Sequence, residues 1–225
     1  MTRILSMDAA TPWGNVALVA TEEGARPEVV AEAGLLSRDS HAPHLLALAE
    51  SLLAEAGWPR TSLDAFAATR GPGSFTGLRV ALGTVSGLAL SSGRPTYGIG
   101  TLEAMAELFG PAQGPRVPLL DARRGEVYGA VYDPQGNPPR ELVAPWVGAP
   151  ERALESAGRS AVLFGPGAEA YATRLGEAGR AAPRLPRGIA GAAGRLAMDR
   201  VLRGVAGGEG MSPLYLRPAD AEIKG

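Results

Sequence analysis

The sequence predicts an α/β protein built from two copies of one βββαβα unit. Apolar and polar residues alternate in three neighbouring strand-like stretches near the start of the chain, and three more follow near its middle. In each half, these stretches precede a helix-like segment, an apolar strand and another helix. A duplicated α/β unit places a cleft between its halves, so the repeat also indicates where a ligand would bind.

The first half reads as a three-stranded meander followed by a helix, a strand, a helix and a strand. The expected strands are residues 3–8, 15–21, 27–33, 63–70 and 96–100, and the expected helices are 41–57 and 77–93. Leucines and alanines of segment 41–57 fill a continuous arc of about 160° when placed at ~100° per residue. Gly57 ends this helix, because glycine accepts the left-handed conformation that follows many helices.

The second half repeats this order after the glycine- and proline-rich linker 110–116. The expected strands are 117–122, 126–133, 140–146 and 160–165, and the expected helices are 150–157, 168–179 and 189–204. We therefore expect a first lobe at 1–110 and a second at 111–225, with the last helix and the tail in the second lobe.

Composition excludes several classes of function. The 225 residues include no cysteine, which removes disulfides, thiolate nucleophiles and cysteine metal sites. A formal net charge of −1 shows no basic excess for a nucleic-acid surface or an anionic membrane. Asp8 and Pro12 interrupt the first apolar stretch, and no window approaches the ~18 apolar residues of a membrane span. We expect a cytoplasmic protein without membrane contact.

The stretch TRGPGSFTGLR at 69–79 lies between a strand and a helix, where many proteins hold a phosphate. It lacks the lysine of a Walker motif and the G-x-S-x-G spacing of a nucleophile elbow. The favoured interpretation is structural: Gly71 and Gly73 supply backbone angles that suit glycine, and Ser74 or Thr76 caps the helix that starts near Gly77.

Helix 77–93 has no charged residue between Arg79 and Arg94. Its bulky residues form one face, expected to lie on the sheet, and small residues, including Gly83 and Gly87, form the opposite face. Each glycine costs ~1 kcal/mol relative to alanine inside a helix, so we infer a close neighbour. Helix 41–57 of the same chain and a helix of another polypeptide are equally good candidates from the pattern.

Two acidic residues occupy matching places in the repeat. Asp8 and Asp121 each end the first strand of their half, facing the expected cleft, although aspartate is also common in turns. Arg123 and Arg124 follow at once and would either clamp an acidic group or sit in a solvated turn.

The chain has two histidines, His41 and His44, at a helix start near Asp39. The H-x-x-x-H spacing of zinc proteases is absent, and a third ligand is not evident. An exposed helix-capping cluster is favoured over a metal site.

Together, ILSMDAAT, SHAPHLLALAESLLAEAG, RGPGSFTGLR, GTLEAMA, DARRGEVYGAVYD and PLYLRPADAE resemble the TsaB (YeaZ) family across nearly the whole chain. This family supplies a bacterial partner subunit in tRNA threonylcarbamoyladenosine synthesis. The resemblance implies the ASKHA fold of actin-like ATPases, which is ribonuclease H-like and has two lobes of the same topology.

The resemblance also implies a non-catalytic subunit that binds the catalytic subunit TsaD and works with the ATPase TsaE, meeting tRNA indirectly through the complex. Alone, such a subunit forms a homodimer. In this family the two helices of the first lobe form the interface. The resemblance therefore favours a helix of another polypeptide, over helix 41–57, as the close neighbour of helix 77–93. The implied interface residues are Leu45, Leu48, Leu52, Leu53, Val80, Gly83, Thr84 and Gly87.

The sequence departs from TsaD at its catalytic motifs. The metal-holding H-x-x-x-H is absent, and bulky arginines stand where the second repeat would offer glycines. The run GPGAEAY at 165–171 lies where such folds hold adenosine. A degenerate nucleotide cleft would comprise Asp8, Thr11, Asp121, Arg123, Arg124, Gly165 and Gly167.

No cofactor and no metal are expected, and weak ATP or ADP binding, mainly in the complex, stays open. One alternative is an ATPase that acts through Asp8 and Asp121. A second is a peptidase, which has little support because the sequence contains no cysteine, no nucleophile elbow and no pair of zinc-binding histidines at the required spacing. A third is direct tRNA binding, which the net charge disfavours.

Overall fold

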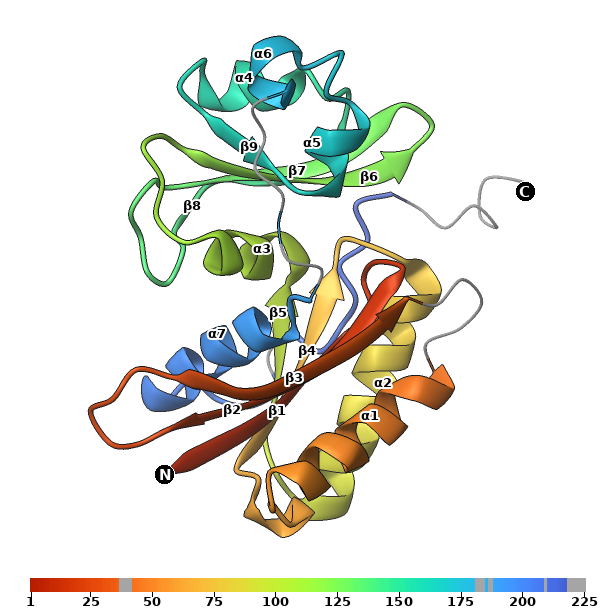
Figure 1. Cartoon of the computed structure of the whole chain (residues 1–225), viewed down its shortest axis with the longest axis vertical. Coiled ribbons are helices and arrows are strands. Elements are labelled where there is room, and N and C mark those ends of the chain that lie inside the picture. The colour runs from red at the N-terminus through yellow and green to blue at the C-terminus, as the bar shows by residue number, and fades with distance from the viewer. Residues whose placement is uncertain (37–41, 181–184, 186–187, 209, 218–225) are drawn as a thin grey trace. The chain divides into compact units, whose positions relative to one another are not determined.

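The computed structural model divides the chain into two compact units. Unit 1 contains Met1–Ala104 and Arg187–Leu214, and unit 2 contains Met105–Pro186 and Tyr215–Gly225 (Figure 1). The structure describes residues 1–36, 42–180, 185, 188–208 and 210–217.

Unit 1 is built on a five-stranded mixed sheet in the order β3-β2-β1-β4-β5. The strands are β1 Thr2–Asp8, β2 Trp13–Thr21, β3 Glu28–Leu36, β4 Ala65–Gly71 and β5 Thr96–Gly100. Strands β1, β2 and β3 form an antiparallel meander, whereas β4 runs parallel to β1 and β5. Strands β1, β2 and β4 are almost wholly buried, as their continuous apolar sequences require, and the edge strand β3 alternates.

Helices cover both faces of this sheet. Helices α1 (Ala42–Glu55) and α2 (Phe75–Ser92) lie on one face, and α7 (Ala190–Leu202) lies on the other (Figure 1). The 3₁₀ turn η1 (Arg60–Ser62) precedes β4. Helix α2 begins at Ser74, whose hydroxyl accepts from Gly77 N–H, and it ends at the left-handed Gly93. Leucines, valines and alanines from α1, α2 and the strands form the core on this side.

Unit 2 contains a four-stranded sheet in the order β8-β7-β6-β9. Its elements are β6 Arg116–Arg123, β7 Glu126–Tyr132, β8 Glu141–Gly148, α4 Arg152–Ala157, β9 Val162–Phe164, α5 Pro166–Ala170 and α6 Gly176–Arg180. Strands β6, β7 and β8 again form an antiparallel meander, and β9 is parallel to β6. The three short helices pack against the sheet around Trp146 and Leu163.

Both sheets therefore contain the expected βββαβ order, and the expected two-repeat α/β fold of the ASKHA class is confirmed. Three details differ. Helix α3 (Thr101–Phe109), which was not expected, begins in unit 1 and ends in unit 2. The helix expected at 168–179 is two short helices, α5 and α6, separated before the left-handed Gly176. The last helix, α7, packs on the sheet of unit 1, although we expected it in the second lobe.

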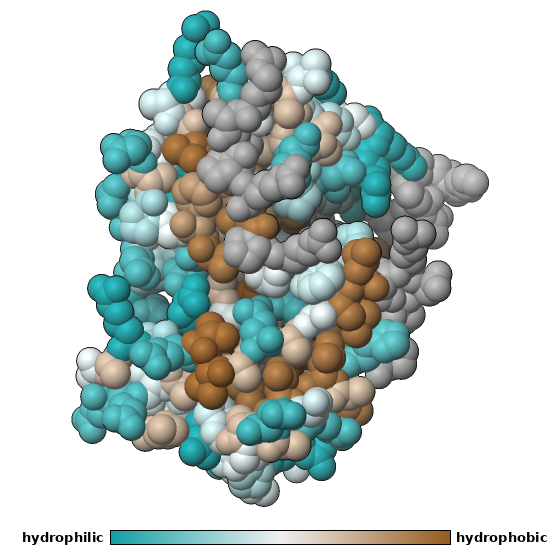
Figure 2. Space-filling view, viewed as in Figure 1, coloured by the Kyte–Doolittle hydropathy of each residue, from teal (hydrophilic) through white to brown (hydrophobic). Residues whose placement is uncertain are grey.

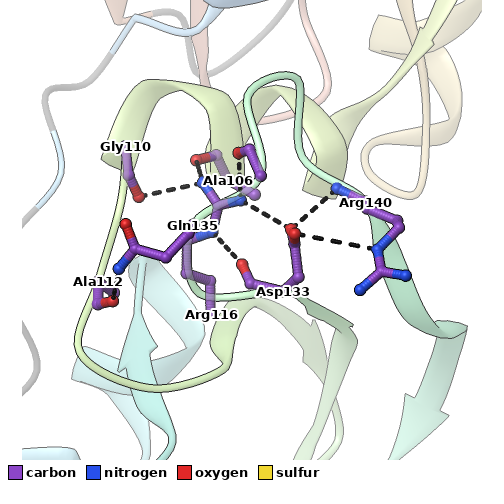
Figure 3. Close-up of polar contacts among 8 residues, drawn as sticks. Ala106, Gly110, Ala112, Arg116, Asp133, Gln135 and Arg140 are labelled. Carbon is purple, nitrogen blue, oxygen red and sulfur yellow. Dashed lines mark hydrogen bonds and ion pairs between the residues drawn. The ribbon is translucent and has the colours of Figure 1, made fainter.

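Arg116 at the start of β6 organises the backbone of unit 2 (Figure 3). Its side chain is 1% exposed and its Nε and Nη2 donate to the carbonyl oxygens of Asp133 and Gly136, both at 2.7 Å. Nη1 donates to the carbonyl oxygens of Ala106 at 3.2 Å and Gly110 at 3.1 Å. One guanidinium thus joins the end of α3, strand β6 and the β7–β8 connection.

Candidate functional site

Helix α2 buries its bulky face and leaves its small face open, as the sequence predicts. Leu78, Ala81, Leu82, Val85 and Ala89 are buried against the sheet. On the other face, Gly83 and Gly87 are exposed, and a Cβ atom on either would meet no described atom within 4 Å. The close neighbour inferred for these glycines is therefore not α1 or any other described part of the chain.

Larger apolar side chains are also exposed on α1 and α2. Leu90 of α2 is 87% exposed, and at ~100° per residue it falls between Phe75 and Gly83 on the helix wheel. Phe75 is 38% exposed, and Leu46 of the neighbouring helix α1 is 40% exposed. We define Leu46, Phe75, Gly83, Gly87 and Leu90 as the α1–α2 outer face.

The expected leucines of α1 do not belong to this surface. Leu45, Leu52 and Leu53 are buried in the core of unit 1, and Leu48 is half-buried against it. The wide apolar arc of α1 is used within the chain, because α1 packs against both the sheet and α2. Val80 and Thr84 of α2 are likewise half-buried.

A second group of exposed apolar residues lies on the edge strand β3. Val30 is 50% exposed and Leu36 is 55% exposed. Figure 2 shows hydrophobic residues gathered over the part of unit 1 that contains β3 and α1. The apolar surface of this unit therefore extends beyond α2.

The glycine loop packs against the connection between β1 and β2. The carbonyl oxygen of Ala10 accepts from Ser74 N–H at 2.7 Å. A Cβ atom on Gly73 would collide with Ala10, and one on Gly77 would collide with the carbonyl oxygen of Ala9. Gly71 similarly faces the backbone of Leu214, and Thr76 is exposed. These close approaches within the chain support a structural role for the loop at the start of α2.

This geometry predicts opposite effects for two glycine substitutions in α2. Gly77→Ala should destabilise the protein by about 1–3 kcal/mol, because the new methyl group would displace the Ala9 backbone. Gly83→Ala should stabilise it by up to about 1 kcal/mol through helix propensity, because the site is open. Urea unfolding followed by far-UV circular dichroism checks both, and equal effects would contradict the packing described.

Asp8 is wholly buried at the end of β1. Its Oδ1 accepts from the hydroxyl of Thr69 at 2.5 Å and from Ala10 N–H at 3.0 Å. Its Oδ2 is buried and has no hydrogen-bond partner among the described residues. Burial raises the pKa of Asp8 to about 6, partly offset by these two hydrogen bonds, and the charge of Glu32 raises the pKa further.

Asn15 is a second buried polar residue at this end of the β1–β2 pair. It lies directly opposite Asp8 in the β1–β2 pair, and opposite residues share one face of a sheet. Its Nδ2 donates to Oε1 of the exposed Glu32, which also accepts from Gly191 N–H at 3.1 Å. The Oδ1 of Asn15 is a second buried acceptor without a described donor. Thr11 instead bonds the backbone of Trp13.

In unit 2, Asp121 lies near the tip of the β6–β7 hairpin. Its Oδ1 accepts from Arg123 N–H at 2.8 Å and from the hydroxyl of Tyr171 at 3.0 Å. Arg123 and Arg124 are exposed and adopt positive φ angles of 63° and 55°. The structure thus brings together Asp121 and Arg123, which form an ion pair at 3.4 Å.

Gly165 and Gly167 allow α5 to lie close to β6. A Cβ atom on Gly165 would collide with Met105, and one on Gly167 would approach the backbone of Leu119 and Leu120 within 3 Å. The space beside both glycines is therefore filled by the protein itself, which explains their presence without adenosine.

His44 is exposed at the start of α1, whereas Asp39 and His41 lie outside the described residues. The described part of the chain contains no group of three or more His, Asp or Glu residues able to hold a metal ion. Within that same part, no helix is both long and apolar enough to cross a membrane.

Comparison with known proteins places this arrangement in a family. The family model for TsaD, tRNA N6-adenosine threonylcarbamoyltransferase, matches residues 18–178. The chain is 39% identical to the Escherichia coli K12 tRNA threonylcarbamoyladenosine biosynthesis protein TsaB over 60% of this chain and 57% of that relative. The match thus spans little more than half of that protein. The Bacillus subtilis protein of the same name is 27% identical over 98% of this chain and 96% of its own.

A solved structure agrees with the sequence relatives. YeaZ from Pseudomonas aeruginosa is 30% identical and superposes with a TM-score of 0.75, covering 96% of this chain and 100% of that one. The two-sheet topology and the family match define a TsaD-like protein of the ASKHA class. More narrowly, the chain belongs to the TsaB (YeaZ) family.

Sequence reasoning missed several residues of these sites. Leu90 could have been identified from the sequence, because a large apolar residue on the small-residue side of an uncharged helix is expected to pack against another protein segment. Glu32 gave no local signal, because Gly191, whose N–H donates to it, is distant in the sequence.

Proposed function

We propose that the chain is a non-catalytic subunit that docks on a TsaD-type threonylcarbamoyltransferase and supports transfer of a threonylcarbamoyl group to adenosine beside the anticodon of tRNA. The observation that carries this proposal is the outer face of α2, where Gly83 and Gly87 lie open beside the exposed Leu90. Two open glycines one turn apart allow another helix to approach the α2 backbone closely.

The composition of this surface suits a helix of a partner. From Val80 to Gly93, α2 and its C-cap contain no charged residue. A docked partner would therefore bury no unpaired ionised side chain of this segment. Leu46, Phe75 and Leu90 would supply the apolar contacts around the glycines. A second copy of the chain would use the same face when the transferase is absent, and TsaE would join the heterodimer.

The state of Asp8 supports a non-catalytic role. Asp8 is wholly buried, and one of its carboxylate oxygens already accepts hydrogen bonds from Thr69 and Ala10. The relatives named as biosynthesis proteins fit a supporting role in the same pathway.

The double substitution Gly83→Leu/Gly87→Leu tests the proposal. The two side chains would hold an approaching helix away, so we expect binding to the transferase to weaken at least tenfold, about 1.4 kcal/mol. Size-exclusion chromatography with light scattering, run on this chain with the TsaD-family protein of its organism, measures complex formation.

Gly148→Leu in β8 is the matched control, because it adds the same side chain to the other unit. Circular dichroism should show that each variant keeps its helix content. Full binding by the double α2 variant would remove the support for docking through this face.

A further inference from the structure

The segment that follows α7 wraps around the β5 edge of the sheet in unit 1 (Figure 1). We define residues 205–208 and 210–214 as the C-terminal strap. The strap begins at the end of α7, on one face of the sheet, where Val205 N–H donates to the carbonyl oxygen of Arg200. Met211 packs against the core beneath α1 and α2, on the other face. The strap therefore joins the two helical layers of the unit.

Glycines let the strap lie directly against the edge strand. A Cβ atom on Gly98 of β5 would collide with the carbonyl group of Gly210. Gly208 N–H donates to the carbonyl oxygen of Thr96 at 2.8 Å. Gly208 and Gly210 have φ angles of 91° and 71°, a region that favours glycine. The path of the strap along β5 is thus specified by glycines on both sides of the contact.

The strap ends at the start of α2. Leu214 N–H donates to the carbonyl oxygen of Arg70 in β4 at 2.6 Å. A Cβ atom on Gly71 would lie 2.6 Å from the carbonyl oxygen of Leu214 and 3.1 Å from the side chain of Leu78. Leu78 belongs to the first turn of α2. The end of the strap and the first turn of the docking helix therefore pack around the same glycine.

The strap is weakly held compared with the elements that it joins. Residues 206–208 and Ser212 are exposed, and Met211 and Leu214 are only half-buried. Ordering glycine costs more backbone entropy than ordering any other residue. Segments with exposed backbone and few buried apolar contacts open locally at free energies well below that of global unfolding. The strap can therefore detach while the sheet and helices of unit 1 stay folded.

We propose that the strap is a conformational device that controls docking through α2. When the strap is seated, Leu214 supports Gly71 and the first turn of α2. When the strap detaches, the carbonyl oxygen of Arg70 loses the hydrogen bond from Leu214, and the start of α2 must be reordered at a cost to docking. The inference rests on the proposed function and adds regulation to it. Because coupling between two sites is reciprocal, docking of the transferase must also hold the strap in place.

Gly98→Ala tests this coupling in the full-length chain. The added methyl group displaces Gly210 and so detaches the strap, and the φ angle of Gly98 lies outside the left-handed region, so β5 accepts alanine. Gly148→Ala is the matched control, because its methyl group would meet only Arg152 at 3.9 Å, an ordinary contact. Hydrogen exchange measured by mass spectrometry follows the strap and residues 71–78. Light scattering follows complex formation with the TsaD-family protein.

We expect Gly98→Ala to speed exchange in the strap and at 71–78 and to weaken transferase binding about five- to tenfold. The control should behave as the wild type. In the wild type, bound transferase should slow exchange in the strap, although the strap is not part of the α1–α2 outer face. Faster exchange in the strap with unchanged binding, or a strap that the bound transferase leaves unprotected, would overturn the inference. Failure of the wild-type chain to bind the transferase would overturn the proposed function and the inference with it.

Met211→Ala is a second variant that leaves the sheet unchanged. It removes the side chain that anchors the strap in the core, so it should reproduce the faster exchange and the weaker binding. Far-UV circular dichroism should show wild-type helix content, and Met211→Ala decides the question if Gly98→Ala does not fold. Normal transferase binding by Met211→Ala with a detached strap would contradict the coupling. Unchanged exchange in the strap would show that the strap does not detach, which would also overturn the proposal.

Discussion

Replacing Arg116 with leucine is expected to lower the free energy of unfolding by about 3–5 kcal/mol, because the change strands buried polar groups. Leucine fills much of the same space but donates no hydrogen bond. The carboxylate of Asp133 and four carbonyl oxygens would each lose the hydrogen bond that Arg116 donates (Figure 3). The end of α3, strand β6 and the β7–β8 connection would then lose their common attachment.

Two comparisons isolate the role of this guanidinium. Arg116→Lys keeps the charge but lacks the planar fork, so we expect an intermediate loss. Arg140 also faces Asp133, but its side chain is 76% exposed and 3.9 Å away, so Arg140→Leu should cost less than about 1 kcal/mol. Urea unfolding followed by tryptophan fluorescence, to which the buried Trp146 of unit 2 contributes together with Trp13 and Trp58, measures all three. Similar small losses for Arg116→Leu and Arg140→Leu would contradict this account.

Acid should weaken the same network. Burial raises the pKa of Asp133, but the hydrogen bonds from Arg140 N–H and from Arg116, with the charges of both arginines, lower it more, and the net shift is downward. A carboxyl group with a lowered pKa favours the folded state above its unfolded pKa. That contribution is lost as the pH falls through the folded pKa of Asp133, below 3.8.

The repeated fold was predictable because its signals are local. Alternating strands, their turns and the glycine after α1 each occupy a short window, and the structure keeps their order. Helix α3 begins directly after β5, with no connecting loop. Because turn residues were used to separate the predicted elements, Thr101–Phe109 was not predicted as a helix of its own. The helix predicted at 168–179 is divided because α5 ends at Ala170, where Tyr171 leaves the helical conformation with φ −112° and ψ 23°, and α6 begins only at Gly176.

The location of α7 was not predictable, because periodicity shows which face of a helix is apolar but not which sheet it meets. Close packing decides this here. A Cβ atom on Gly194 would collide with Val19 of β2 and approach Ser6 of β1, so a small residue is needed at this crossing. The same limit explains the leucines of α1. Their pattern identified an apolar arc, but the sheet and α2 cover it within the chain.

The open face of α2 could be predicted from the sequence because the absence of charge and the two glycines are unusual together in one helix. The buried site at Asp8 could not be predicted in the same way. Asp8 and Thr69 come from strands that are far apart in the sequence, and the missing donors become visible only in three dimensions.

Asp8→Asn should raise the free energy of unfolding at pH 7.5 by about 3 kcal/mol, the equivalent of a pKa shift from 3.8 to about 6 at ~1.4 kcal/mol per unit. Asparagine carries no charge to bury. Its Oδ1 would still accept from Thr69 and Ala10, and its Nδ2 would take the place of Oδ2, which has no partner among the described residues.

The pH dependence follows from the direction of the shift. The folded protein holds the Asp8 proton more tightly than the unfolded chain, so protonation favours folding. This contribution is fully present below pH 3.8 and is lost as the pH rises through about 6. The stability difference between Asp8→Asn and the wild type should therefore grow between pH 4 and pH 6.5, roughly the interval between the two pKa values, and level off above it.

Urea unfolding of both proteins at several pH values measures this difference and cancels the contributions of other acids. Thr69→Val provides an independent check, because losing the hydroxyl that stabilises the charged form should move the rise to higher pH. A difference that does not change with pH, or an Asp8→Asn variant less stable than the wild type at pH 7.5, would show that the ionised carboxylate is stabilised by its surroundings. Either result would contradict the burial cost that we assign to the Asp8 carboxylate.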